Sequence, residues 1–90
     1  MYTLLVEEGV IKVLEKLPQK AFRQVMLKLL SLQFNPLPHD CKRVGPGYRV
    51  DSGEYRAMYF VDAKEQLVRI VLVGKRNDDQ VYRQFMRRFG

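Results

Sequence analysis

A nearly continuous apolar run over residues 67–73 constrains the fold of this chain more than any other feature, because six of its seven residues are Leu, Val or Ile. A half-exposed strand alternates apolar and polar side chains, whereas a strand that is apolar on both faces must be covered on both. Gly74 ends the run. We therefore predict a buried strand over residues 66–73, in a sheet with other elements packed on each side.

Two further segments with strand composition precede this run, over residues 48–51 and 54–62. Both are rich in aromatic and β-branched side chains, which favour strands. The Ser-Gly pair at residues 52–53 fits a two-residue hairpin turn, and residues 63–65 supply a second, looser turn. The three segments predict an antiparallel meander, and the β-rich residues 2–6 predict a first strand at the N-terminus.

Two amphipathic helices are predicted between the first strand and the meander, because apolar residues recur there at helical spacing. The first set is Val10, Ile11, Val13, Leu14 and Leu17, and the second is Phe22, Val25, Met26, Leu29 and Leu30. Pro18 separates the sets and suits the first turn of the second helix, where its missing N–H costs nothing. The pair is therefore expected to form a helical hairpin.

A third helix is predicted over residues 77–89, with Asn77 or Asp78 as its N-cap. Its apolar side consists of Val81, Phe85, Met86 and Phe89. Alternation along the second meander strand sets Tyr55, Ala57, Tyr59 and Val61 on one face and Arg56, Met58 and Phe60 on the other. We expect the helical hairpin on the first of these faces and the C-terminal segment over Met58 and Phe60.

Residues 35–47 contain two early prolines and a late Gly-Pro-Gly, which predicts a loop. His39 lies in this loop beside Asp40, and histidine is the usual general base of metal-free ribonucleases. We do not assign it that role, because it is a lone histidine with no second His or Glu at a telling spacing.

The 90 residues, 47% of them hydrophobic, suffice for one core but not for two domains, so we predict a single domain over residues 1–90. The longest apolar runs are too short for a secretory signal or a membrane span. Cys41 is the only cysteine, which excludes an internal disulfide and leaves no multi-cysteine metal pattern. These features predict a cytoplasmic protein without a membrane partner.

Positive charge is concentrated in two parts of the sequence, within a net charge of +6. Residues 41–56 carry four Lys or Arg against two Asp or Glu, and residues 75–90 carry five against two. These two segments hold five of the six excess charges. The net charge makes nucleic acid, an acidic protein or an anionic membrane surface a plausible partner, and the local excess favours a binding site over a generally charged surface.

The predicted hairpin turn places two arginines opposite each other. If residues 52–53 form the turn, Asp51 faces Glu54. In the same register Arg49 lies directly opposite Arg56, and like charges in that position destabilise a sheet. This suggests an anion between the two guanidinium groups, whose planar forks suit phosphate. The alternative, which geometry alone does not distinguish, is that Asp51 and Glu54 balance two solvent-exposed arginines.

Three stretches of the sequence carry a recognisable pattern. They are Tyr-Arg-Val-Asp-Ser-Gly-Glu-Tyr-Arg-Ala-Met-Tyr at residues 48–59, Val-Arg-Ile-Val-Leu-Val-Gly-Lys-Arg at residues 68–76, and Val-Tyr at residues 81–82. Together they resemble the core signature of the RelE/ParE toxin superfamily, over nearly the whole chain. The resemblance implies a toxin of a toxin-antitoxin pair with a small α+β fold, in the order β-α-α-β-β-β-α, with an antiparallel sheet and the helical hairpin on one face.

RelE-like members of the superfamily cut mRNA in the ribosomal A site, whereas ParE-like members share the fold but inhibit DNA gyrase without nuclease activity. We favour an mRNA endoribonuclease, with a gyrase inhibitor as the runner-up and a non-enzymatic RNA-binding domain third. The implied partners are the ribosome with its A-site mRNA and a cognate antitoxin, which we expect to be acidic and to fold on binding. No metal or other cofactor is expected.

The resemblance assigns roles residue by residue. Arg56 matches the catalytic arginine of the middle meander strand, Arg76 the arginine closing the last strand, and Tyr82 the tyrosine beyond it. Arg49 occupies a position where RelE members carry a basic residue, whereas Asp51 departs from the pattern, because many relatives have Lys or Arg there. We expect the ribose 2′-OH to attack the scissile phosphate with Tyr82 as its base, while Arg56 and Arg49 stabilise the extra negative charge. Arg76 is expected to hold the phosphate or to assist the leaving 5′-oxygen. The alternative for Tyr82 is a ring that only caps the C-terminal helix.

Other basic residues are expected to contact RNA phosphates through sequence-independent, salt-sensitive interactions. They are Lys42, Arg43, Lys75 and Arg83, with Arg87 and Arg88 farther along the chain. Of Lys75 and Arg76, which leave the last strand, at least one should reach the arginine cluster. The alternative is that these charges form only a solvated face.

Overall fold

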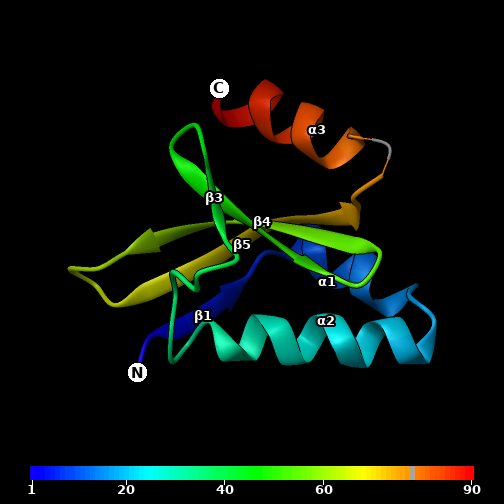
Figure 1. Ribbon diagram of the computed structural model, residues 1–90, viewed down its shortest axis with the longest axis horizontal. Coiled ribbons are helices and arrows are strands. Elements are labelled where there is room, and N and C mark those ends of the chain that lie inside the picture. Colours follow the sequence, from blue (N-terminus) through cyan, green and yellow to red (C-terminus); the bar gives the residue numbers. More distant parts are fainter. Residues whose placement is uncertain (78) are drawn as a thin grey trace.

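The computed structural model describes residues 1–77 and 79–90 and consists of one sheet with helices on both faces (Figure 1). In chain order the elements are β1 (Thr3–Val6), α1 (Glu8–Glu15), α2 (Gln19–Ser31), β2 (Lys42–Val44), β3 (Gly47–Ser52), β4 (Tyr55–Asp62), β5 (Leu67–Lys75) and α3 (Gln80–Phe89). In Figure 1, α1 and α2 lie below the sheet and α3 lies above it. The predicted α+β class and three helices are confirmed.

The sheet is mixed rather than wholly antiparallel, with the strand order β1-β5-β4-β3-β2. β1 runs parallel to β5, and the other neighbouring strands are antiparallel. The prediction of an antiparallel sheet is therefore corrected for this one pair. The chain between β1 and β5 includes two helices and three strands, so no turn motif in the sequence reveals the direction of β1. As predicted, β5 is covered on both faces, since Val68, Ile70 and Val73 belong to one core and Val71 and Leu72 to the other.

Residues 42–44 form the short edge strand β2, inside the segment 35–47 that was predicted as a loop. β2 pairs antiparallel with β3 across a two-residue turn in which Gly45 has a φ of +52°. Glycine adopts this left-handed conformation at little cost, so the Gly-Pro pair at residues 45–46 closes a hairpin instead of only breaking the chain. Local composition missed β2 because its formation depends on the partner strand.

The helical hairpin packs on the predicted face of the sheet. The buried residues of this core are Val10, Leu14, Val25, Leu29 and Leu32 from the helical layer, and Val50, Ala57, Tyr59, Val68, Ile70 and Val73 from the sheet. The Tyr59 hydroxyl donates a hydrogen bond of 2.8 Å to the Pro36 carbonyl. Burial, with a contribution from Cys41, raises the pKa of Tyr59, so the hydroxyl keeps its proton at neutral pH. The hydrogen bond therefore connects the loop after α2 to β4.

α3 packs on the opposite face, over Met58 and Phe60 as predicted. The buried residues of this second core are Val44, Met58, Val71, Val81 and Phe85, with Phe60, Leu72, Met86 and Phe89 packed around them. A β-bulge interrupts the pairing of β4 and β5 beneath α3, because Met58 pairs with Leu72 whereas the next residue, Tyr59, pairs with Ile70. The extra residue, Val71, and its neighbour Leu72 therefore both contribute to the core under α3.

The beginnings of two helices differ from the prediction. α3 begins after Asp79, whose φ is +57°, so the N-cap predicted at Asn77 is wrong. The other candidate, Asp78, lies outside the described residues. Pro18 occupies the N-cap of α2, with a φ of −55°, one position before the first turn.

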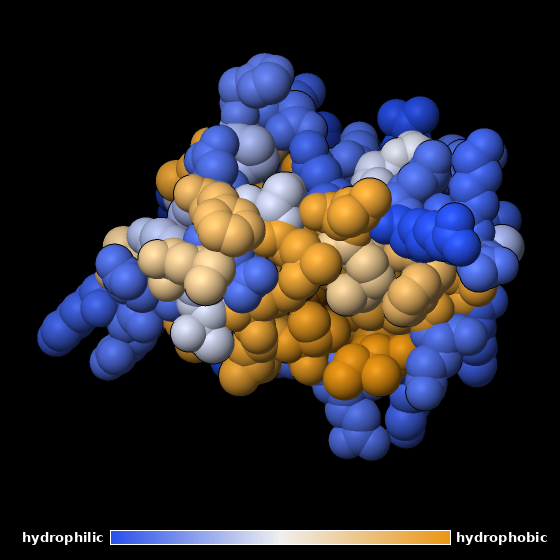
Figure 2. Space-filling model, turned by 90° about the horizontal axis from the view of Figure 1, so that it is seen from below, coloured by the Kyte–Doolittle hydropathy of each residue, from blue (hydrophilic) through white to orange (hydrophobic). Residues whose placement is uncertain are grey.

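The outer surface of the helical layer carries exposed apolar side chains. Seen from below, orange atoms gather over the middle of this surface (Figure 2). Its most exposed members on and after α2 are Leu27, at 68%, and Phe34, at 76%. None of the helices in residues 1–77 and 79–90 is long and apolar enough to cross a membrane.

Candidate anion-binding site

The hairpin between β3 and β4 turns at residues 53–54, one residue later than predicted. Ser52 pairs with Tyr55, and Gly53 has a φ of +57°. A two-residue hairpin turn requires this left-handed conformation at its first position, and glycine supplies it there. The pairing is shifted by two residues from the predicted register, so every side chain keeps its predicted face but lies opposite a different residue.

Arg56 consequently faces Asp51, and the predicted facing pair of Arg49 and Arg56 is wrong, because Arg49 lies opposite Met58. Asp51 accepts two hydrogen bonds from Arg56, of 2.8 Å from Nε to Oδ1 and 3.4 Å from Nη2 to Oδ2. Arg76 Nη1 lies 3.8 Å from the same Oδ2. Two guanidinium groups from neighbouring strands thus converge on one carboxylate.

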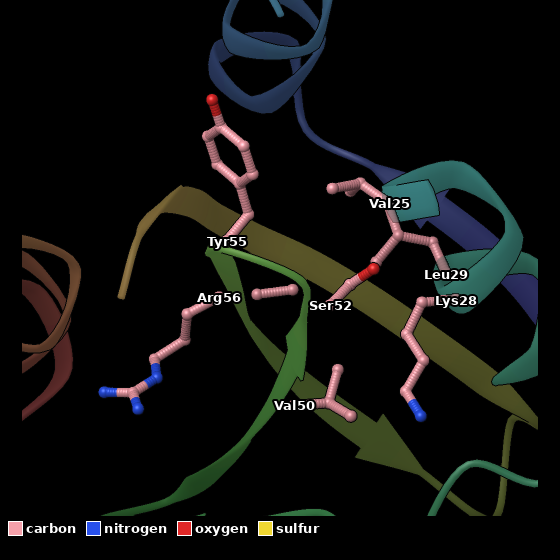
Figure 3. A pocket seen from close by; sticks show the side chains of 8 residues that line it. Val25, Lys28, Leu29, Val50, Ser52, Tyr55 and Arg56 are labelled. Carbon is pink, nitrogen blue, oxygen red and sulfur yellow. The ribbon is translucent and has the colours of Figure 1, made fainter. Parts of the chain in front are cut away.

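The Arg56 side chain is held at the base of this site. It is 11% exposed, against 37% for Asp51 and 52% for Arg76. In Figure 3 it turns away from Val25 and Leu29 of α2, which line the small cavity on the other side of the hairpin. The open side of the cluster is therefore formed by Asp51 and Arg76.

The charge of Asp51 is stabilised by its surroundings. Burial acts to raise its pKa, but the hydrogen bond from Arg56 and the positive charges of Arg56, Arg49 and Arg76 outweigh burial and lower the pKa. The carboxylate is therefore ionised at neutral pH. It occupies the position between guanidinium groups where a phosphate was predicted, so the site holds an anion supplied by the chain itself.

Replacing Asp51 with asparagine should make the protein bind sulfate or phosphate more strongly, because the neutral amide leaves Arg56 and Arg76 without their counter-charge. The measurement is the midpoint of thermal unfolding in sodium sulfate and in sodium chloride at equal ionic strength, since an anion that binds only the folded state raises the midpoint. The control is Glu15→Gln, which removes an exposed carboxylate of α1. A sulfate effect no larger than that of the wild type would contradict the assignment.

The stability difference between wild type and Asp51→Asn should also depend on pH. The unfolded carboxyl titrates near about 3.9, and its pKa in the folded protein is lower. The charge of Asp51 therefore contributes fully to the free energy of unfolding above about pH 4. This contribution is lost as the pH falls through the folded-state pKa. Urea unfolding of both proteins at pH 7 and at acidic pH measures this difference.

The first turn of α3 lies beside the same end of the sheet. Gly74 pairs with Arg56, and Val81 of α3 occupies the space above Gly74, since a Cβ at this glycine would collide with Val81 Cγ2. Tyr82 follows Val81 and is 42% exposed. Arg76 lies just past β5, where its backbone N–H donates to the β3–β4 turn at 3.0 Å. The contact at Gly74, which sequence patterns missed, thus sets Tyr82 beside the end of the sheet where Arg56 and Arg76 lie.

Lys42 and Arg49 form a second basic pair on this face, directly opposite each other in β2 and β3. They line a small hollow together with Asp40, Val50 and Asp51. This pair was not expected, because β2 was predicted as loop. Lys42 therefore lies on the same face of the sheet as Arg49, Arg56 and Arg76, and we refer to these four residues with Asp51 as the arginine row.

Three other predicted RNA-binding residues lie outside this row. Arg43 pairs with Tyr48 on the face of the helical hairpin, where its guanidinium lies 5.2 Å from the ring centroid and donates to the hydroxyl at 3.2 Å. Lys75 pairs with Tyr55 and so points to that face as well. Arg83 lies on the exposed side of α3. Strand alternation separates the first two residues from the arginine row.

The described parts of the chain hold no group of three His, Cys, Asp or Glu residues that could bind a metal ion. His39 is exposed in the loop between α2 and β2. The site presents the guanidinium groups of its arginines, the Lys42 ammonium and the Asp51 carboxylate, with the Tyr82 phenol beside it. The cationic groups hold and stabilise negatively charged oxygens, and the phenol can exchange a proton.

Comparison with known proteins identifies similar structures although no protein-family model and no curated protein matches the sequence. An E. coli RelE toxin variant in the free state has 26% identity and a TM-score of 0.81, covering 99% of this chain and 98% of that one. The archaeal RelE-RelB complex from Pyrococcus horikoshii has 25% identity and a TM-score of 0.79, covering 86% and 97%. The toxin-antitoxin complex RelBE2 of Mycobacterium tuberculosis has 25% identity and a TM-score of 0.75, covering 83% and 98%.

These matches extend over nearly the full length of the other chains, and the match to the E. coli toxin also covers nearly all of this chain. They agree with the resemblance in residues 48–59, 68–76 and 81–82. The chain therefore has a RelE-like toxin fold.

Proposed function

We propose that this chain is a toxin that cleaves mRNA on the ribosome, in the cytoplasm, without a metal ion. The observation that carries the proposal is the convergence of Arg56 and Arg76 on the Asp51 carboxylate, at 2.8 and 3.8 Å. Guanidinium groups that hold a carboxylate in this way also suit a phosphate, whose oxygens have a similar spacing and charge. The RelE-like fold supports the same reaction class.

In the proposed reaction the ribose 2′-oxygen forms a bond to phosphorus and the bond from phosphorus to the 5′-oxygen breaks. Tyr82 takes the proton of the 2′-OH, and water returns a proton to the leaving 5′-oxygen. Arg56 stabilises the additional negative charge of the transition state, and Arg76 holds a phosphate oxygen. Asp51 uses two of the five N–H donors of Arg56, so the remaining donors are available to the substrate.

Tyr82→Phe should lower the single-turnover cleavage rate about a hundredfold, since a general base contributes at least this factor in most enzymes. The fold should be unchanged, because the ring is largely outside the core and the substitution removes only the hydroxyl. The assay is in vitro translation of a defined mRNA with mapping of the new 5′ ends. Equal cleavage by wild type and variant would remove Tyr82 as the base but leave the nuclease proposal standing.

Intact mRNA in the presence of the wild-type protein would refute the nuclease proposal itself. A supercoiling assay with DNA gyrase then tests the ParE-like alternative. The similar structures reported above are RelE proteins, which does not favour that alternative.

We also propose an acidic antitoxin as the partner of this chain. Similar structures contain RelE bound to RelB. Residues 16–39 include Lys16, Lys20, Arg23 and Lys28 and no Asp or Glu. Lys28 pairs with Asp40 at 2.7 Å, which leaves the positive charge of Lys16, Lys20 and Arg23. These side chains belong to the layer that also exposes Leu27 and Phe34 (Figure 2), a combination that suits an acidic segment with an apolar stripe.

A further inference from the structure

Lys42 and Arg49 face each other across β2 and β3, and this pairing does not stabilise the sheet. Like charges directly opposite each other in an antiparallel pair destabilise the sheet. Neither residue has an ion pair with a carboxylate among the described residues. A sequence selected only for folding gains nothing from this arrangement, whereas an anion bound beside the two side chains would offset their repulsion.

The neighbouring carboxylates are already engaged with other cations. Asp40 lies 2.7 Å from Lys28 Nζ, and Asp51 is bound by Arg56. The charge of Arg49 lowers the pKa of Asp51, but the two side chains are not within ion-pair distance in the structure. The hollow beside Lys42 and Arg49 therefore has two cations of its own and carboxylates that are neutralised elsewhere.

The position of this pair relative to Arg56 fits a chain of phosphates. Arg49 precedes Asp51 by two residues on β3, and the two side chains share one face of the sheet. Two residues of a strand span about 7 Å, which is comparable with the separation of successive phosphates in single-stranded RNA. Tyr48, the aromatic neighbour of Arg49, lies on the other face, so the hollow offers charge and no platform for stacking a base.

We propose that Lys42 and Arg49 form a second phosphate subsite, which binds the phosphate adjacent to the scissile one. This inference rests on the proposed RNA cleavage and assigns Arg49 to substrate binding instead of transition-state stabilisation. Arginine grips the phosphate oxygens through its planar fork, and Lys42 adds a point charge from the edge strand. Asp51 lies between this subsite and Arg76, so it separates the two phosphate positions along the row.

Lys42→Ala should raise the KM for a defined mRNA about tenfold and leave kcat within about twofold, since a contact with a flanking phosphate acts equally on substrate and transition state. The control is Lys64→Ala, an exposed lysine of the turn between β4 and β5, which should leave KM unchanged. The second arm uses mRNA with one neutral methylphosphonate linkage next to the cleavage site. Because the neutral linkage removes the contacts of both Lys42 and Arg49, this substrate should raise the KM of the wild type more than Lys42→Ala does. It should raise the KM of Lys42→Ala by a smaller factor than that of the wild type, since only the Arg49 contact is left to lose. Additive losses, an unchanged KM, or a loss confined to kcat would overturn the subsite.

A binding measurement keeps the test independent of cleavage. Fluorescence anisotropy of a short single-stranded RNA with the full chain gives the dependence of affinity on salt. Loss of one phosphate contact should reduce the slope of log K against log salt by about 0.7. If wild type does not cleave mRNA, the proposed function fails, but an unchanged slope in Lys42→Ala and in Arg49→Ala is the result that rejects the subsite.

Discussion

Arg56→Ala is expected to lower the rate of mRNA cleavage about a hundredfold or more, because it removes the guanidinium at the base of the site. Its side chain is 11% exposed and is fixed by two hydrogen bonds to Asp51, so the group is held in place before substrate binds. A preorganised charge of this kind stabilises a transition state without paying for its own reorientation. The measurement is the single-turnover rate of cleavage on programmed ribosomes.

Two controls separate this effect from misfolding and from general charge. Arg23→Ala removes an exposed arginine of α2 and should cleave as the wild type does. Arg56→Lys keeps the charge but not the planar fork, and we expect only partial recovery of the rate. If Arg56→Ala cleaves within a factor of a few of the wild type while remaining folded, Arg56 is not a catalytic residue.

Phe85→Ala is expected to destabilise the protein by about 3–5 kcal/mol, the usual cost of deleting a buried phenylalanine ring. Phe85 is fully buried beneath α3, with ring centroids 5.6 Å from Phe60 and 5.1 Å from Phe89. A small domain has a free energy of unfolding of about 5–15 kcal/mol, so this loss removes a large share of it. Urea unfolding followed by circular dichroism measures the change.

Leu27→Ala is the matched control, because Leu27 is a large apolar residue that is 68% exposed. It should change the free energy of unfolding by no more than about 0.5 kcal/mol. Similar effects of the two substitutions would mean that α3 does not bury a core of its own. Since Val81 and Tyr82 belong to the same helix, loosening α3 in Phe85→Ala should also lower the cleavage rate.

The sequence specifies the core around Phe85 more fully than it specifies the partner of Arg56. The core under α3 follows from periodicity, since Val81, Phe85 and Phe89 recur every four residues and Met58 and Phe60 alternate with the residues of the other face. The partner of Arg56 does not follow in this way. It depends on which two residues close the hairpin, and the segment offers Ser52-Gly53 and Gly53-Glu54 as neighbouring choices.

The sequence by itself determined the helices, every strand except β2, the two covering layers and the face of each residue in β3 and β4, because these depend on periods of 3.6 and 2 that are local properties of the chain. Only the tertiary structure decided that Arg56 faces Asp51, that Lys42 faces Arg49 and that β1 runs parallel to β5. Moving the turn by one residue changes every partner by two positions and leaves every face unchanged. Faces are therefore readable from one strand alone, whereas partners are fixed by the left-handed glycines at the turns and by contacts between segments far apart in the chain.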